Sequence, residues 1–169
     1  MAELNERLER SFSVRNELER ELRDREKCIS KVNELAQQGF SILLVTQTKF
    51  DEWVVLFSRP DSCDVYVKRA YSFSYNNDLT LYSVYYKEEN RIFIEDIQST
   101  EENSNREYGS FAMKELLKMA GKLKVRKING KISPKDWDHV DRLKHFYSKF
   151  GFTVELNEAS QSGRIYMEL

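Results

Sequence analysis

The sequence has few of the residues that are typical of metal-binding and disulfide-rich proteins. Its 169 residues include two cysteines, Cys28 and Cys63, two histidines and two prolines. The cysteines match neither the paired spacing of a structural zinc site nor a disulfide framework, and the histidines do not cluster. We therefore predict no metal site, and a reducing, cytoplasmic setting is the expectation for such a chain.

The sequence also lacks an excess of charge of one sign, and it lacks long apolar runs. The 27 basic and 28 acidic side chains leave a net charge of −1, which gives no global attraction to nucleic acid or anionic lipid. No apolar run approaches the roughly 18 residues of a membrane-spanning helix. The opening MAELNERLERSF lacks the apolar core of a signal peptide. Neither nucleic acid nor a membrane is expected as a partner.

Apolar residues are frequent enough to build one sizeable core, since hydrophobic residues make up 40% of the chain and aromatic residues 12%. The first 38 residues predict one charged helix, because glutamate repeatedly precedes arginine by four residues, the order that stabilises a helix surface. These pairs are Glu3–Arg7, Glu6–Arg10, Glu19–Arg23 and Glu21–Arg25. Gly39 then supplies a helix stop. We predict two parts, an extension or interaction helix over 1–38 and a domain over 40–169.

The predicted helix carries a partial heptad repeat. Its apolar members are Leu4, Leu8, Leu18, Leu22, Ile29 and Val32. The same register places Ser11, Arg15 and Arg25 on the seam, where a continuous coiled coil avoids polar and charged residues. Two interpretations stay open: the helix lies along its own domain, or it binds a partner, a weak homodimer included.

Residues 40–98 have the pattern of β-strands joined by short turns. The expected strands are Phe40–Thr46, Trp53–Phe57, Val65–Ser74, Leu79–Tyr86 and Arg91–Gln98. The second segment also fits helical spacing, since Phe50, Trp53 and Phe57 would share one helix face. Short polar breaks such as 76–78 separate the later strands and predict an antiparallel meander.

The remaining chain alternates helix and strand, which predicts a mixed α/β (α+β) fold. The expected elements are a helix over Phe111–Leu123, a strand over Lys127–Ile132, a helix over 133–150, and strands over Thr153–Leu156 and Arg164–Leu169. Pro134 suits the first turn of the second helix, and Gly151 suits its end. The last two strands are expected to pair as a hairpin around Ser162 and Gly163.

The stretch 106-REYGSFAMKELL-117 places one glycine, Gly109, between a polar loop and the first of these helices. The loop, Ser99–Glu107, follows directly on a strand. Backbone N–H groups at a helix start lack intrahelical partners, and the helix macrodipole favours anions there. A glycine leaves room for close approach. A lone glycine before a helix is more often a turn residue, so this feature indicates a phosphate site only in combination with others.

The order of these elements resembles the GNAT superfamily of N-acyltransferases. The resemblance rests on IFIEDI at 92–97, on REYGSFAMKELL and on RLKHFYSKFGF at 142–152, and it covers roughly residues 79–169. Its most specific piece is the Tyr-x-x-x-Gly-Phe pattern from Tyr147 to Phe152. The resemblance implies a central twisted mixed sheet flanked by helices, to which the long N-terminal helix is added, and it implies acetyl-CoA as a cosubstrate.

The resemblance also implies where acetyl-CoA binds. The family holds it where two parallel strands splay apart, here Arg91–Gln98 and Lys127–Ile132. The pantetheine arm pairs with backbone at the end of the first strand, and the pyrophosphate rests on amides of the loop that opens the first helix. The residues that correspond are Ile97, Gln98 and Ser99 on the strand, and Asn105, Arg106, Glu107, Tyr108, Gly109 and Ser110 in the loop.

This loop departs from the family's pattern, which is an Arg or Gln, two residues, Gly, one residue, then Gly or Ala. Reading from Arg106 puts Gly109 on the first glycine and bulky Phe111 on the last small position. The other register puts Gly109 on the last small position, Ser104 on the Arg or Gln, and Glu107 on the central glycine. We favour the second register because the residues after Gly109 then match the family's helix better. In either register at least one standard feature is missing.

The resemblance implies a catalytic tyrosine as well. Tyr147 corresponds to the tyrosine that donates a proton as the coenzyme thiol leaves, although without the family context a core tyrosine is the simpler interpretation. The amine must also lose a proton to a base, and the family often places a carboxylate near the end of the central strand, where Glu95 and Asp96 lie. Strand neighbours point to opposite faces. Because Asp96 shares its face with Ile92 and Ile94, periodicity directs it toward the core, and both carboxylates stay candidates. The two histidines of the second helix are further candidates.

We therefore predict an acetyl-CoA-dependent N-acetyltransferase that acts on a primary amine of a small-molecule or peptide acceptor. The departing loop leaves a second interpretation, in which a GNAT-like module binds acyl-CoA without turnover and works through its helical extension. A third interpretation, a structural coiled-coil adaptor, is less favoured because charge breaks the helix seam.

Overall fold

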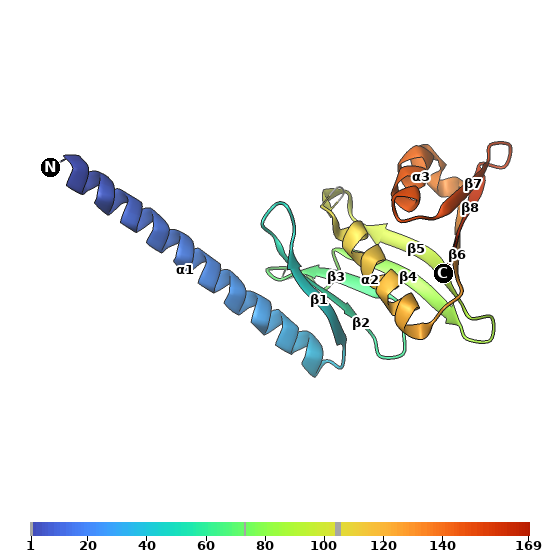
Figure 1. The fold of residues 1–169 in the computed structure, drawn as a ribbon, viewed down its shortest axis with the longest axis horizontal. Coiled ribbons are helices and arrows are strands. Elements are labelled where there is room, and N and C mark those ends of the chain that lie inside the picture. The colour runs from blue at the N-terminus through green and yellow to red at the C-terminus, as the bar shows by residue number, and fades with distance from the viewer. Residues whose placement is uncertain (1, 73, 104–105) are drawn as a thin grey trace.

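A computed structural model of the protein describes residues 2–72, 74–103 and 106–169, the side chains of residues 2–5, 8 and 101 excepted. The helices are α1 (Ala2–Gln37), α2 (Tyr108–Leu123) and α3 (Val140–Lys149), with 3-10 turns η1 (Glu101–Asn103) and η2 (Pro134–His139). The strands are β1 (Ser41–Gln47), β2 (Trp53–Ser58), β3 (Val65–Arg69), β4 (Leu79–Tyr86), β5 (Arg91–Ser99), β6 (Lys127–Ile132), β7 (Thr153–Asn157) and β8 (Ser162–Glu168). Figure 1 shows their arrangement.

The described strands form one sheet in the order β1-β2-β3-β4-β5-β6-β8-β7. Neighbouring strands are antiparallel except β5 and β6, which are parallel. The main core lies where α2 and α3 cover one face of the sheet. The meander of the first strands and the mixed α+β fold with a long N-terminal helix are therefore confirmed. No helix among the described residues is long and apolar enough to cross a membrane.

The ambiguous segment is strand β2, and its burial explains the ambiguity. Val54 and Leu56 lie in the core beneath α2, whereas Val55 and Phe57 lie in a second cluster beneath α1. Successive residues of a strand point to opposite faces, so a strand that is buried on both faces is apolar at every position. The alternation that distinguishes a strand from a helix is then absent from the sequence.

Strand β3 ends at Arg69, although the sequence predicted a strand as far as Ser74. The Asp78 carboxylate accepts a hydrogen bond from the backbone N–H of Arg69 at 2.7 Å. The hydroxyls of Ser72 and Ser74 accept from the backbone N–H two residues ahead, at 3.3 and 3.1 Å. Such local bonds compete with a strand ladder, and the sequence pattern of apolar residues does not reveal them.

Three boundaries in the second half also differ from the prediction. Helix α2 begins at Tyr108 rather than at Phe111, so Gly109 lies in its first turn. The second predicted helix is divided into the 3-10 turn η2 and helix α3. The last hairpin turns at 158–161 rather than at Ser162 and Gly163, because the Asn157 side chain accepts a hydrogen bond from the Ser160 N–H and closes the turn there.

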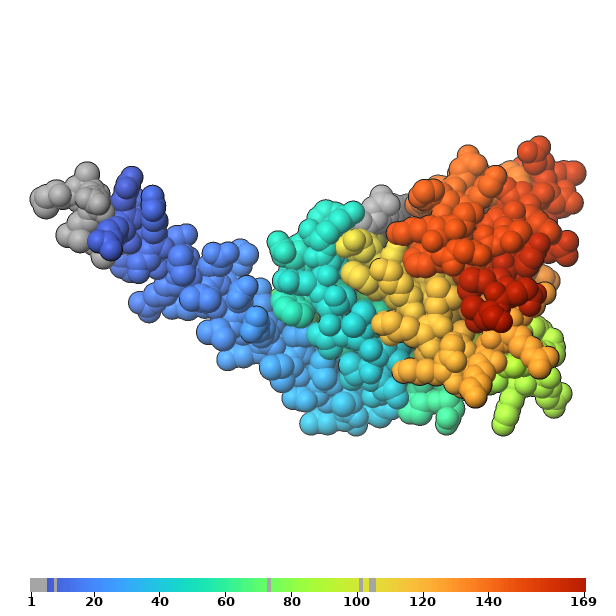
Figure 2. All heavy atoms as spheres, in the orientation of Figure 1, coloured from blue at the N-terminus to red at the C-terminus, as the bar shows by residue number. Residues whose placement is uncertain are grey.

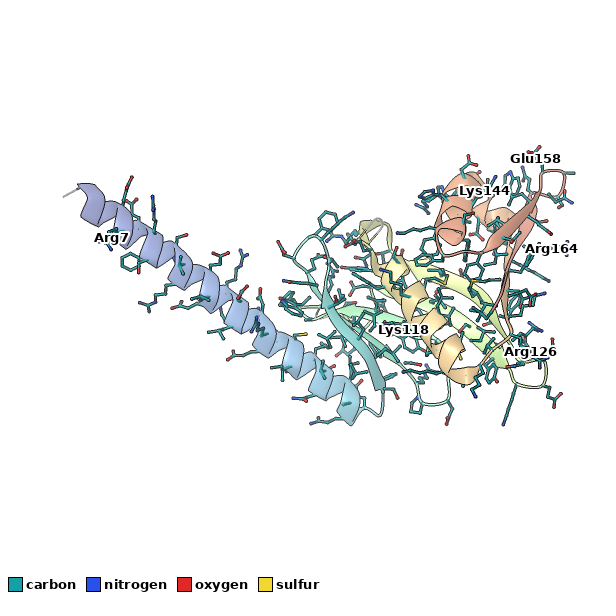
Figure 3. All side chains as sticks on the ribbon, in the orientation of Figure 1. Arg7, Lys118, Arg126, Lys144, Glu158 and Arg164 are labelled. Atoms are coloured by element: carbon teal, nitrogen blue, oxygen red, sulfur yellow. The ribbon has the colours of Figure 1, made fainter. Side chains whose placement is uncertain are left out.

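The C-terminal third of α1 packs on the face of the sheet opposite α2, and the rest of the helix projects from the domain (Figures 1 and 2). Cys28 and Leu35 are buried against β2 and β3. Arg7 points into solvent (Figure 3). The exposed apolar side chains of this helix are Phe12, Val14, Leu18, Leu22 and Ile29. The side chains of Leu4 and Leu8, which complete the predicted stripe, lie outside the described residues.

Candidate active site

Strands β5 and β6 separate after a short parallel pairing. Their register runs from Arg91–Lys127 to Ile94–Gly130, whereas β5 continues to Ser99 beside β4. A Cβ at Gly130 would lie 2.9 Å from the carbonyl oxygen of Ile94, so the close approach at the fork requires a glycine. Beyond the fork, the edge of β5 that faces β6 has no ladder partner in the sheet. Such an open edge can pair with the amide groups of a ligand.

A β-bulge at Glu95 sets the directions of the two carboxylates. Consecutive residues of β4 pair with Ile94 and Asp96, so Glu95 has no residue opposite it. The extra residue reverses the alternation of faces: Ile94 is buried on the α2 side, and after the bulge Ile97 takes that side. Asp96 is exposed on the other face. The expectation from periodicity that Asp96 points to the core is wrong, because periodicity assumes an unbroken strand.

The Asp96 carboxylate is held in a fixed position at the fork. One oxygen accepts a hydrogen bond from the backbone N–H of Ile97 and the other from the Gln98 side-chain amide, each at 2.8 Å. Glu95 is also exposed. Both carboxylates can therefore exchange protons with water, and Asp96 has the better-defined geometry.

A cavity of about 310 Å³ lies on the α2 side of the fork, between the first turn of α2 and helix α3. Seven of the nine residues predicted to bind coenzyme line it: these are Ile97, Ser99, Arg106, Glu107, Tyr108, Gly109 and Ser110. Gln98 points to the opposite face with Asp96. Asn105, and Ser104 of the favoured register, lie outside the described residues.

Glu107, the residue before α2, adopts the left-handed conformation with φ 67°. Residues with a Cβ rarely adopt this conformation, and glycine reaches it without cost. This agrees with the favoured register, in which Glu107 stands at the central glycine position of the family's loop. Gly109 differs, because a Cβ there would make an ordinary contact of 3.5 Å with Phe146. The fold therefore does not require a glycine at 109.

Helix α3 contributes to the cavity His145, one of the candidate bases, and two charged residues that the sequence analysis did not assign to the site. Arg142, His145 and Lys149 line the cavity, and the Lys149 ammonium donates a hydrogen bond to the Ser110 hydroxyl at 3.4 Å. Their spacing of three and four residues puts them on one helix face, a signal that was present in RLKHFYSKFGF. Arg142 and Lys149 outnumber the Glu107 carboxylate in the cavity wall, so the cavity attracts anions. The other histidine, His139, does not line it.

Tyr147 lies beside this cavity rather than in its wall. Its side chain is buried and packs edge-on against Phe146 and Phe152, with ring centroids 5.3 and 5.7 Å away. Burial raises the pKa of Tyr147, and the charges of Asp96 and Asp136 raise it further. Its hydroxyl makes no hydrogen bond to another described residue, and it stays protonated at neutral pH. Among the described residues, no group of three or more potential ligands could hold a metal ion.

Comparison with known proteins identifies a sequence relative. The chain is 33% identical over 156 residues to YocC, an uncharacterized protein of Bacillus subtilis (strain 168), and the match covers 89% of this chain and 92% of the relative. No protein-family model matches the sequence.

Two solved structures share the fold. Ard1 from Thermoplasma volcanium superposes with a TM-score of 0.51 at 16% identity, over 65% of this chain and 72% of its own. Naa50 from Arabidopsis thaliana, solved with the bisubstrate analogue CoA-Ac-MVNAL, superposes with a TM-score of 0.52 at 14% identity, over 64% and 74%. These superpositions support the GNAT fold, so the resemblance to this superfamily is confirmed at the level of the fold.

Proposed function

Because the chain belongs to the family of Bacillus subtilis YocC and has the GNAT fold, we propose that it is an acetyl-CoA-dependent N-acetyltransferase. The observation that supports this most is the combination of the fork between β5 and β6 with a positively charged cavity at the first turn of α2. In this proposal the coenzyme phosphates rest on the amides before Ser110, near Lys149, and the pantetheine arm lies along Ile97 and Ser99 toward the fork.

The reaction needs a base, an acid and no covalent intermediate on the protein. The acceptor nitrogen attacks the thioester carbonyl carbon, and Asp96, or alternatively Glu95, takes the proton that the amine loses, directly or through water. As the carbon–sulfur bond breaks, Tyr147 donates its hydroxyl proton to the leaving sulfur. The raised pKa of Tyr147 keeps that proton in place at neutral pH. We propose a primary amine of a small molecule or a peptide as the acceptor.

A second candidate function is a module that binds acyl-CoA without turnover and acts through α1. Two observations favour it: Glu107 places a carboxylate in the anion-binding loop, and Tyr147 does not line the cavity beside that loop. A thioester-consumption assay against pooled amines, peptides and antibiotics, with mass spectrometry of the products, separates the two functions. A product supports the enzyme, and binding without any product supports the module.

Acetyl-CoA is expected to raise the melting temperature of the protein. Ligand at about 100 times its Kd stabilises the folded state by about 2.7 kcal/mol, which is roughly 5–10 °C for a chain of this size. Desulfo-CoA should produce a similar shift because the phosphates supply the main contacts, and dephospho-CoA should produce a smaller one. The measurement is a thermal-shift titration, and the absence of a shift at millimolar acetyl-CoA would contradict both candidate functions.

We propose that self-association through α1 is weak at most. In a parallel pair in register, Arg15 and Arg25 would each face their own copies across the seam. Removal of residues 1–22 is therefore expected to leave the protein monomeric and its melting temperature unchanged. Removal of 1–37 should destabilise the domain by about 3 kcal/mol or more, because Cys28 and Leu35 leave their contacts with the sheet. Light scattering and thermal unfolding check both, and a tight dimer lost with residues 1–22 would contradict the proposal.

A further inference from the structure

The tip of the β1–β2 hairpin is a closed turn that reaches the anion-binding loop. Thr48 closes it: the Thr48 N–H donates to the Glu52 carbonyl at 2.9 Å, and its hydroxyl accepts from the N–H groups of Phe50 and Glu52 at 3.2 and 3.3 Å. Thr48 is buried. The tip therefore has a defined conformation before it contacts any other segment.

Each of the three residues that lead into α2 contacts this tip. The Arg106 guanidinium forms an ion pair with one Glu52 oxygen, and the Tyr108 hydroxyl donates to the other at 3.0 Å. Between them, the Glu107 carboxylate accepts from the backbone N–H of Lys49 at 2.8 Å. Arg106 also donates to the Glu102 carbonyl at 2.9 Å, so it connects the tip to the start of the loop.

These contacts hold a conformation that the loop alone would not favour. Glu107 is in the left-handed region, which costs free energy for a residue with a side chain and persists when the surroundings enforce it. Tyr108 is 1% exposed, so without Glu52 its hydroxyl would be a buried donor with no partner. Glu52 is the shared acceptor of both neighbours of Glu107, and it contacts them across more than fifty residues of sequence.

We infer that Glu52 is a positioning residue for coenzyme binding: its carboxylate fixes residues 106–108 so that the amides of the first turn of α2 face the phosphates. This rests on the proposed function. Glu52 does not line the cavity and acts through Arg106 and Tyr108. Arg106 then has a role other than phosphate binding, because the Glu52 carboxylate already engages its guanidinium.

The test measures acetyl-CoA affinity by calorimetry, below the melting temperature of every variant. Glu52→Ala is expected to raise the Kd on the order of tenfold to a hundredfold and to raise the KM for acetyl-CoA, with kcat at saturation little changed. Glu52→Gln should have a smaller effect, because an amide can still accept from Arg106 and bond with Tyr108. Asp51→Asn is the matched control: it removes a carboxylate one residue away, and asparagine tolerates the left-handed conformation of residue 51 (φ 59°).

Hydrogen exchange of the Phe111 amide, which donates to the Glu107 carbonyl at 3.0 Å, supplies a readout that needs no ligand. Exchange should be faster in Glu52→Ala than in the wild type and unchanged in Asp51→Asn. A Kd and an exchange rate equal to those of Asp51→Asn would overturn the inference. If the wild type itself bound no acetyl-CoA, the proposed function would fail, and exchange alone would decide the role of Glu52. If Glu52→Ala did not fold, Glu52→Gln would decide. A raised Kd or faster exchange in that variant would support the inference, and wild-type values of both would overturn it.

Discussion

Tyr147→Phe is expected to lower kcat by a factor on the order of 10²–10⁴, the usual contribution of a positioned acid, while the Kd for acetyl-CoA stays nearly constant. The substitution removes one oxygen and leaves the ring contacts with Phe146 and Phe152 in place. Because the hydroxyl makes no hydrogen bond to another described residue, its loss strands no buried partner and should leave the melting temperature almost unchanged. Steady-state kinetics on a verified acceptor and calorimetry with acetyl-CoA check the two halves of this prediction.

The matched control is Tyr86→Phe. Tyr86 lies at the end of β4 that pairs with Arg91, away from the fork, and a phenylalanine preserves its contact with the Arg91 guanidinium. This variant should keep wild-type kcat. If kcat of Tyr147→Phe also stayed within about threefold of wild type, a barrier change well under 1 kcal/mol, Tyr147 would be a core tyrosine and water or another group would protonate the sulfur.

Gly109→Val is expected to reduce acetyl-CoA affinity by about tenfold to 150-fold. The branched side chain would cover the first-turn amides, and a hydrogen bond between an amide and a charged group contributes about 1.5–3 kcal/mol. Valine would also press on Phe146, so Gly109→Ala accompanies it. The alanine Cβ makes an ordinary contact of 3.5 Å with Phe146, which should keep the protein folded, and its methyl group should weaken binding to a smaller degree. Calorimetry measures both variants.

Helix α2 offers its own control, Gly121→Ala. A Cβ at Gly121 would meet no atom within 4 Å, and alanine is favoured over glycine in a helix interior by about 0.8–1 kcal/mol. This variant should melt a few degrees higher, on the order of 2–4 °C, with an unchanged Kd. Wild-type affinity in Gly109→Val would mean that the phosphates bind away from the first turn of α2.

The sequence by itself predicted the features that depend on neighbouring residues. Glutamate–arginine pairs four residues apart indicated α1. Hydrophobic periodicity indicated α2 and most strands, because one amphipathic element has a regular spacing of apolar side chains. The stretches around Gly109 and Tyr147 indicated the GNAT fold for the same reason: each is a short local pattern. Arg142 and Lys149 could have been assigned to the site in this way, since they share one face of α3 with His145.

Only the tertiary structure decided the features that depend on contacts between distant segments. Strand β2 is apolar from Trp53 to Phe57 because two layers cover it, and both layers come from elsewhere in the chain. Asp96 faces solvent because a bulge, which shows only in the pairing with β4, reverses its direction. Glu52 contacts Arg106 and Tyr108 across more than fifty residues. A contact of this kind leaves no periodic signal, because the residues between its partners are free to vary so long as the sheet brings the two ends together.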